Sequence, residues 1–388
     1  MLDFLHISNP ELDFYELFAI VVFSVLLVSR IVYQFFLTRP VFKNKKKNKR
    51  EIKMEENTAI SLLLTIRNEE ENLKNNLQEI LKIKNVEFEL VVIDDFSQDN
   101  SLSVLGTLKK DYNKLYFSSL NQDIRFSVKL SQNIAIKAAK NDWVMIIPVS
   151  LVLFNKEWLT RVSQNFLKDK NVVVNYSNVK HTGSFFNILY RTERFLQQLR
   201  CARFSKAGLP FIYSEENVAF RKELYFSSGS YGPKMNEPYA NLELLINQFI
   251  DKNKVTFLFQ PETSIFSAQL TGKKDYFDLL KKGIRIEANL PFKVRMALYF
   301  EEIFRLAFIL SVLVLIVLLP EMWPLIFGVL LIKIALNLFI INTAVKHLNE
   351  RKIFIPSLMY GWLMPYFKTV YRWYFYQSRR RNKWRKRV

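Results

Sequence analysis

The sequence predicts an α/β domain with a mainly parallel sheet, flanked by apolar segments long enough to cross a membrane. Between residues 58 and 270, short apolar runs alternate with amphipathic helical patterns. This alternation is typical of a parallel sheet covered by helices. Longer apolar runs precede residue 40 and follow residue 302. Because parallel sheets of this kind bind ligands at the carboxyl ends of their strands, we expect the functional site there.

Residues 1–42 are predicted to form a transmembrane anchor. The run LFAIVVFSVLLVSRIVYQFFL is long enough to span a bilayer, and Arg30 can extend its charge to one interface. A cleaved signal peptide is the alternative, but the positive charge follows the apolar run and no small-residue cleavage site is present. Acidic residues precede the run and a basic linker, 43–57, follows it. The positive-inside rule therefore predicts an external N-terminus.

The domain at 58–270 contains runs with the two periodicities of regular structure. β-branched and apolar runs predict strands, and apolar residues at helical spacing predict helices. The predicted strands are AISLLLTI (59–66), FELVVID (88–94), WVMIIPV (143–149) and VVVNYS (172–177). The predicted helices are NLKNNLQEILKI (72–83), LSQNIAIKAAK (130–140) and KEWLTRVSQNFL (156–167).

The region after the domain is predicted to return to the membrane. Residues 271–302 form a connector of membrane-surface helices, and 303–341 form a transmembrane hairpin with Pro320 at its turn. Residues 342–388 form an interfacial aromatic segment and a basic cytoplasmic tail. Within them, 353–377 is rich in Trp and Tyr and interrupted by two prolines, which is typical of an interfacial helix. A spanning helix is the alternative, and it would place the basic tail outside.

The net charge of +20 is concentrated in basic runs at 43–50 and 379–387, each beside an apolar or aromatic segment. This position favours anionic lipid headgroups of the bilayer as the partner, and not nucleic acid. The single Cys201 excludes an intrachain disulfide. The three histidines are scattered without acidic, Cys or His companions at metal-ligand spacing, so no histidine metal site is expected.

Polar residues follow the first two predicted strands in specific patterns. The first strand ends in TIRNEEENL and the second in VVIDDFSQDNSL. Further along, NIAIKAAKNDW runs from a helix into the third strand, and ENVAFRKELYF contains an Asn-x-Ala-x-Arg segment. Together these motifs resemble family 2 glycosyltransferases over roughly residues 58–270. The resemblance implies the GT-A fold, a Rossmann-like α/β fold that binds a nucleotide sugar.

The resemblance also implies a nucleotide site at the first two strand ends. The expected nucleotide-binding residues are Thr65, Arg67, Glu69, Asp94 and Asp95. Carboxylates there can accept hydrogen bonds from a base or from ribose hydroxyls. The alternative interpretation is that the acidic residues after the second strand cap the following helix, a role that suits them well.

Three positions depart from the family pattern. Pro148, Val149 and Ser150 stand where the family has Asp-x-Asp, the carboxylates that hold a divalent cation against the diphosphate. No divalent cation or other cofactor is therefore expected. Asn241 and Leu242 stand on the acidic pair that supplies the general base. Glu243, one position further on, is the candidate substitute base.

The third departure concerns the diphosphate. The family's Gln-x-x-Arg-Trp type motif should fall near 277–286, where this chain has FDLLKKGIRI. Lys282 and Arg285 from this run, together with Lys129, are the candidate diphosphate-binding residues. Lys281 is a further cation there, and Glu237 is a second candidate base.

Two functional interpretations follow. In the first, the chain is a glycosyltransferase homologue on the cytoplasmic face of a bacterial inner membrane, descended from enzymes that transfer a sugar to a lipid-linked or envelope polysaccharide acceptor. In the second, it is an inactive scaffold or regulatory subunit with a protein partner in an envelope-assembly complex. Nucleotide sensing without transfer is a third reading, and it needs only the first two strand ends.

Overall fold

The structure is a computed structural model that describes residues 13–43, 59–122, 127–153, 155–351, 353 and 363–385. The basic linker predicted at 43–57 lies outside these ranges except for its first residue. The basic tail and the predicted interfacial segment are described only in part.

A seven-stranded, mainly parallel sheet forms the centre of the domain, as the alternating pattern predicted. Its strand order is β3-β2-β1-β4-β8-β6-β9. The first four strands in this order are parallel, β8 is antiparallel to both of its neighbours, and β6 pairs in parallel with β9. The strands are β1 (Ile60–Ile66), β2 (Phe88–Asp94), β3 (Leu115–Ser119), β4 (Trp143–Ile146), β6 (Val172–Asn175), β8 (Val218–Arg221) and β9 (Val255–Leu258). A smaller sheet joins β5 (Leu151–Val152), β10 (Ile265–Ser267) and β7 (Ser177–Val179).

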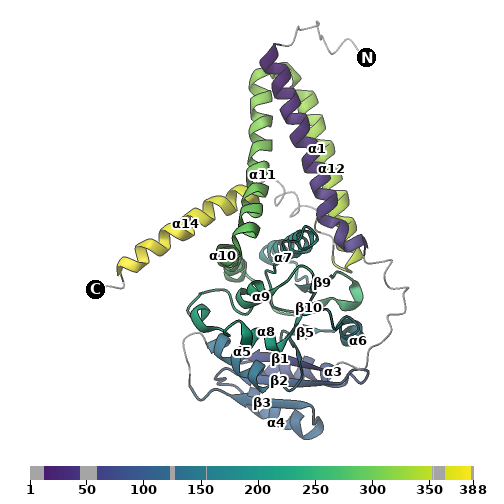
Figure 1. Ribbon diagram of the computed structural model, residues 1–388, viewed down its shortest axis with the longest axis vertical. Coiled ribbons are helices and arrows are strands. Elements are labelled where there is room, and N and C mark those ends of the chain that lie inside the picture. The colour runs from purple at the N-terminus through teal and green to yellow at the C-terminus, as the bar shows by residue number, and fades with distance from the viewer. Residues whose placement is uncertain are drawn as a thin grey trace.

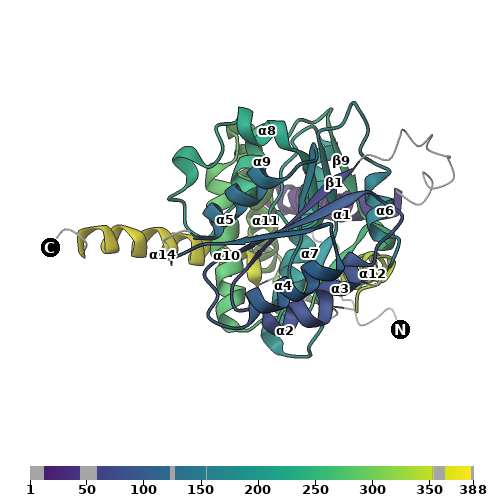
Figure 2. The same cartoon turned by 90° about the horizontal axis from the view of Figure 1, so that it is seen from below.

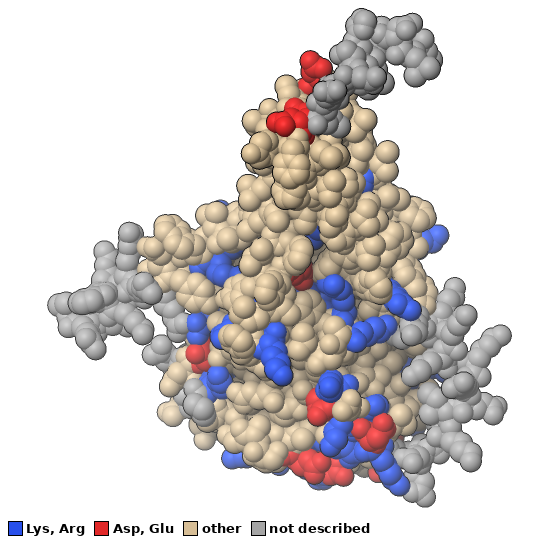
Figure 3. Space-filling view, turned by 45° about the horizontal axis from the view of Figure 1, so that its top comes forward, with Lys and Arg blue, Asp and Glu red and all other residues tan. Residues whose placement is uncertain are grey.

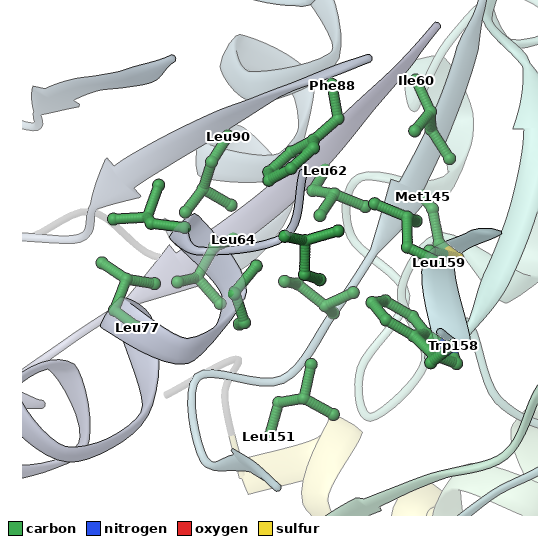
Figure 4. Close-up of a cluster of buried hydrophobic side chains, with 14 of the residues drawn as sticks. Ile60, Leu62, Leu64, Leu77, Phe88, Leu90, Met145, Leu151, Trp158 and Leu159 are labelled. Carbon is green, nitrogen blue, oxygen red and sulfur yellow. The ribbon is translucent and has the colours of Figure 1, made fainter. Parts of the chain in front are cut away.

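Helices cover both faces of the large sheet, because both faces of its central strands are apolar (Figure 2). Along β1, Leu62 and Leu64 point to one face and Leu63 to the other, as the two-residue strand period requires. Figure 4 shows the first face, where the β1 and β2 side chains meet Leu77 and Trp158. This face packs against a π-helical turn (Leu73–Leu77), which α2 (Glu70–Asn72) precedes, and against α3 (Gln78–Leu81), α4 (Ser101–Asp111) and α6 (Trp158–Ser163). The opposite face packs against α5 (Ser127–Ala138), α8 (Lys222–Ser227) and α9 (Glu243–Phe249).

A stalk of three long helices rises from the domain (Figure 1). It consists of α1 (Phe14–Lys43), α11 (Phe292–Leu318) and α12 (Trp323–His347), with the turn Pro320–Met322 between the last two. Apolar side chains of all three helices pack together near its tip. Two of the helical segments, Phe14–Phe42 and Pro320–His347, are long and apolar enough to cross a membrane. In Figure 3, tan side chains cover the stalk and blue Lys and Arg side chains gather below it.

The helix α7 (Phe185–Lys206) lies between the sheet and the stalk, and its charged side chains hold the two together. Its Ser184 N-cap accepts a hydrogen bond from the Asn187 N–H, which fixes where the helix begins. Arg191 pairs with Glu350 after α12 at 2.6 Å, and both side chains are buried. Arg200 pairs with Glu301 of α11 at 3.2 Å.

Two more helices complete the junction. The helix α10 (Lys273–Asn289) packs beside α7, and α14 (Met364–Arg385) leaves the stalk sideways (Figures 1 and 2). Lys368 of α14 pairs with Glu193 of α7 at 2.5 Å. Arg372 of α14 pairs with Glu287 of α10. The sideways helix is therefore tied to the domain by ion pairs as well as by aromatic contacts.

The first prediction concerns the core. Leu64 is 1% exposed, and Leu64→Ala should lower the free energy of unfolding by roughly 2–5 kcal/mol, because it leaves a cavity between β1 and the helices on its first face. Leu102→Ala is the matched control, since Leu102 is 37% exposed. Urea denaturation followed by circular dichroism measures both. An equal loss in the two variants would contradict this packing.

Candidate active site

The five predicted nucleotide-binding residues lie at adjacent strand ends. The parallel register of β1 and β2 places Thr65 opposite Ile93 and Ile66 opposite Asp94. The loops that follow the two strands therefore start side by side. These loops carry Arg67, Glu69 and Asp95.

The two loops are joined by hydrogen bonds that fix their shape. Asn68 adopts a left-handed conformation with φ of 55°, which Asn tolerates better than most residues. Its N–H donates to the Ser97 hydroxyl at 2.9 Å, and its side-chain oxygen accepts from the Gln98 N–H at 2.7 Å. The Glu69 N–H donates to the Ser101 hydroxyl at 3.0 Å. The edge of the sheet formed by these two loops, the expected nucleotide-side edge, is therefore preorganised.

The two neighbouring aspartates differ in what they bind. Asp94 is buried and accepts hydrogen bonds from the Ser97 N–H, at 3.1 Å, and from the Ser97 hydroxyl. It shapes its own loop and does not cap the following helix, because α4 begins at Ser101 with Asn100 as its N-cap. Asp95 is 3% exposed, and its Oδ1 has no hydrogen-bond partner among the described residues. A buried acceptor without a partner is costly, so Asp95 is the carboxylate of this pair that suits a ligand.

The remaining residues of this group are closer to the surface. Arg67 is exposed, and Thr65 is partly buried at the end of β1. The Glu69 carboxylate accepts a hydrogen bond from the Asn72 side chain at 2.6 Å. These side chains surround the strand ends on which Asp95 lies.

The segment after β4 is engaged in packing. Val149 packs against the buried cluster of the first face. The Ser150 hydroxyl lies 2.6 Å from that of Ser267 in β10, and the Ala268 N–H donates to the Ser150 carbonyl at 2.7 Å. No three His, Cys, Asp or Glu side chains of the described residues come together as a metal-binding group. The residues at 148–150 thus do not fit a divalent cation, which prefers carboxylate ligands.

A buried carboxylate pair lies at the start of α9, where the sequence predicted a substitute base at Glu243. Glu243 at the start of α9 is fully buried, and its Oε1 lies 2.9 Å from Lys282 Nζ of α10. Glu215 accepts hydrogen bonds from Gln132 at 2.9 Å and from the Leu242 N–H at 2.8 Å. The structure therefore joins the candidate base to a candidate diphosphate lysine in one ion pair.

The two carboxyl groups titrate very differently. Burial, and then the charge of Glu243, raises the pKa of Glu215 to about 8. Burial acts in the same direction on Glu243, but the Lys282 ammonium, together with hydrogen bonds from Glu215, Lys282 and the Asn241 N–H, holds the pKa of Glu243 below its usual value. Near neutral pH the pair thus holds one proton, on Glu215, and the Glu243 charge is neutralised by Lys282.

The other candidate cations also have partners within the protein. Lys129 Nζ donates to the carbonyls of Lys234, Met235 and Glu237 at 2.8, 3.2 and 2.6 Å. Burial lowers its pKa to about 8. Arg285 forms an ion pair with the Glu237 carboxylate. Lys129 of α5 and Arg285 of α10 thus hold the segment 234–237 between these two helices.

A polar cavity of 190 Å³ lies beside the Glu243–Lys282 pair. Lys282 lines it together with side chains of α7, α10 and the segment before β8. Arg194 of α7 crosses to Glu216 at 2.7 Å. This wall was not predicted from the sequence, because no helix was expected at 185–206. The N-cap Ser184 and the helical spacing of apolar residues after it were the available signals.

Comparisons with known proteins identify the domain. Residues 61–226 match the Glycosyl transferase family 2 profile. The chain contains a family 2 glycosyltransferase domain. The match includes both loops of the nucleotide-side edge and all of α7.

Named relatives of this glycosyltransferase domain are polysaccharide synthases. A poly-beta-1,6-N-acetyl-D-glucosamine synthase of Staphylococcus epidermidis is 27% identical over 149 residues, which are 38% of this chain and 34% of that protein. One from Staphylococcus aureus strain COL is 28% identical over 137 residues, which are 35% of this chain and 32% of that protein. The chain thus spans about a third of the length of the curated relatives it matches.

A solved structure supports the GT-A fold. The mannosyltransferase PcManGT from Pyrobaculum calidifontis, in complex with GDP-Man and Mn²⁺, has a TM-score of 0.50 and 16% identity. The likeness covers 88% of this chain and 99% of that chain, so it extends beyond the glycosyltransferase domain into flanking helices. The fold predicted from the sequence is confirmed.

The proton held by Glu215 in the Glu215–Glu243 pair predicts that the stability of the glycosyltransferase domain depends on pH. Because the folded-state pKa of Glu215 is raised above its ordinary 4.5, its contribution to stability is fully present below pH 4.5 and is lost as the pH rises through about 8. The melting temperature should therefore fall between pH 5 and 8. Glu215→Gln, which stays neutral, should flatten this fall.

Glu223→Gln is the control, because Glu223 is exposed on α8. Differential scanning calorimetry at several pH values measures all three proteins. The same slope in Glu215→Gln and the unmodified chain would contradict a protonated Glu215.

Proposed function

We propose that this chain is a membrane-bound family 2 glycosyltransferase homologue that binds a nucleotide or nucleotide sugar without a divalent cation and has lost the family's metal and base chemistry. The observation that carries this proposal is the contrast between the two halves of the site. Asp95 and Glu243 each keep one buried oxygen without a partner among the described residues, but no ion pair there neutralises Asp95, whereas the Glu243 Oε1 lies 2.9 Å from the Lys282 ammonium. The half at Asp95 offers a charged acceptor to a ligand, whereas in the other half Lys282 already neutralises the charge of Glu243.

The physical case for lost transfer rests on proton and charge handling. A general base must reach the acceptor hydroxyl within hydrogen-bond distance. The Glu243 carboxylate is 0% exposed, and an ammonium group 2.9 Å away stabilises its charged form, which makes it a poorer base. The metal position carries a packed valine and a serine paired with Ser267. Loss of both groups removes several kcal/mol of transition-state stabilisation each.

The biological role we propose is regulatory. A chain that binds a nucleotide sugar without consuming it can report donor supply to a partner protein in an envelope-assembly complex. The relatives named as polysaccharide synthases support an origin among enzymes that build polysaccharide.

A second candidate is slow, metal-free sugar transfer. The polar cavity lined by Lys282 favours it, because Lys282 could neutralise a diphosphate if it released Glu243, which would then be freed as a base. The two candidates differ in whether Glu243 matters for turnover.

Nucleotide binding tests the first candidate. Isothermal titration of the detergent-purified chain with UDP, GDP and their sugar conjugates should show binding that is unchanged by Mn²⁺ or EDTA. Asp95→Asn should weaken it about tenfold or more, since a charged acceptor is lost. Asp111→Asn, at the exposed end of α4, should have no effect.

Three results would count against the proposal. Absence of binding to every nucleotide would remove its binding half. Binding that requires Mn²⁺ would contradict the metal-free site. Turnover of a nucleotide sugar that disappears in Glu243→Gln would favour the second candidate.

We further propose that α1, α11 and α12 cross a bacterial inner membrane, with the domain in the cytoplasm. The described residues at the stalk tip include three acids, the exposed Asp13 and Glu321 and the partly buried Glu16, and no Lys or Arg. Lys and Arg gather at the domain end (Figure 3). The positive-inside rule then places the tip outside and the N-terminus with it. The helix α14, with exposed Trp373 and Tyr374, suits the interface.

Cysteine labelling tests this orientation. The native Cys201 is 2% exposed, so background labelling should be low. Glu321→Cys should react with a membrane-impermeant maleimide in intact cells, whereas Glu223→Cys should react only after permeabilisation. The opposite pattern would invert the topology.

A further inference from the structure

A cavity of 440 Å³ lies at the base of the stalk between α1, the end of α7 and α11. Its walls are mainly apolar and aromatic. Val32 and Phe36 of α1 and Phe300 and Phe304 of α11 are each 45–55% exposed, so the cavity is flanked by apolar surface.

Two guanidinium groups meet at this cavity around one aromatic ring. The Arg203 guanidinium lies 3.7 Å from the centroid of the Tyr33 ring, and that of Arg30 lies 5.5 Å from it. Arg203 comes from α7 and Arg30 from α1, so the ring brings together cations from two separate elements. Both side chains line the cavity.

Carboxylates of the described residues balance the positive charge at the cavity only in part, through the charge of Glu301. Glu301 is the one acidic side chain that lines it, and Glu301 is bound by Arg200 at 3.2 Å and by Arg305 at 2.8 Å. No ion pair joins Arg30 or Arg203 to an acidic group in the described part of the chain. The buried Nε of Arg30 and of Arg305 also have no hydrogen-bond partner there. Buried guanidinium groups ordinarily have anionic partners.

The depth of the cavity suits a lipid headgroup. Arg30 lies 16 residues after Phe14 (30 − 14), which is about 24 Å along a helix that rises about 1.5 Å per residue. The hydrocarbon core is about 30 Å thick. With the membrane placement proposed above, the two guanidinium groups lie near the domain-side boundary of the hydrocarbon, where headgroup phosphates are within reach of arginine side chains.

We propose that this cavity binds one anionic phospholipid of the domain-side leaflet, with its phosphodiester between Arg30 and Arg203 and its acyl chains along the aromatic wall of α1 and α11. The phosphodiester supplies acceptor oxygens for the unpartnered donors, and the apolar wall matches acyl chains. The lipid contacts α1, α7 and α11 together. Its binding therefore strengthens the junction between the stalk and the glycosyltransferase domain.

The experiment uses the full chain in two kinds of nanodisc. One contains phosphatidylcholine alone, and the other also contains phosphatidylglycerol at one tenth of the amount of phosphatidylcholine. Native mass spectrometry should detect one retained phosphatidylglycerol, and the melting temperature should rise when it is present. Arg30→Gln with Arg203→Gln should abolish both effects. Lys293→Gln, which removes one exposed charge from the start of α11 outside the cavity, should retain them.

Two safeguards keep the result interpretable. The double variant should melt like the unmodified chain in pure phosphatidylcholine, which separates lost lipid binding from lost folding. If it does not, Arg203→Lys serves instead, because it keeps the charge but loses the two-pronged contact, and it should retain the lipid about tenfold less well.

Three outcomes would overturn the assignment. One is equal retention of phosphatidylglycerol by the unmodified chain and by a folded double variant. Another is equal loss in Lys293→Gln, which would indicate unspecific surface charge. A third is displacement of phosphatidylglycerol by substoichiometric polyprenyl phosphate, which would assign the cavity to that lipid. None of these outcomes depends on nucleotide binding, so the proposed nucleotide function stands or falls separately.

Discussion

Charges that leave water need counter-charges, and the junction between stalk and domain is built from such pairs on α7. Three ion pairs join α7 to the long helices or to the segment after them. Arg191 pairs with Glu350 after α12, Glu193 with Lys368 of α14, and Arg200 with Glu301 of α11. Breaking a buried pair leaves an uncompensated charge, which is far more costly than losing a surface pair. These contacts therefore set how the long helices stand on the glycosyltransferase domain.

The same helix connects the junction with the candidate site. Arg194 reaches Glu216 across the 190 Å³ cavity, while Arg200 lies 3.4 Å from the hydroxyl of Tyr213, which lines that cavity. The cavity at the stalk base is lined by Arg203, further along α7. One helix thus contributes to the polar cavity, the stalk contacts and the proposed lipid site.

Within the site, charge compensation separates the two halves. The Asp95 carboxylate has no ion-pair partner among the described residues, whereas in the opposite half the Lys282 ammonium neutralises the charge of Glu243. An enzyme of this fold needs charges that are completed by substrate in its transition state. A site whose cation and carboxylate already neutralise each other stabilises the charge of a transition state less. This is the physical basis of the regulatory role proposed here.

The sequence alone predicted a mainly parallel sheet with four of its strands, the apolar helices and the family resemblance. Strand periodicity and the RNEE and DDFS loops are local signals, because they depend on neighbouring residues. Tertiary structure alone decided which polar groups are free. Asp94 and Asp95 are adjacent, yet only the folded loops show that Ser97 engages the first. The Glu243–Lys282 pair and the Ser150–Ser267 contact join residues far apart in the chain, the latter 117 positions apart, and no local pattern records such partners.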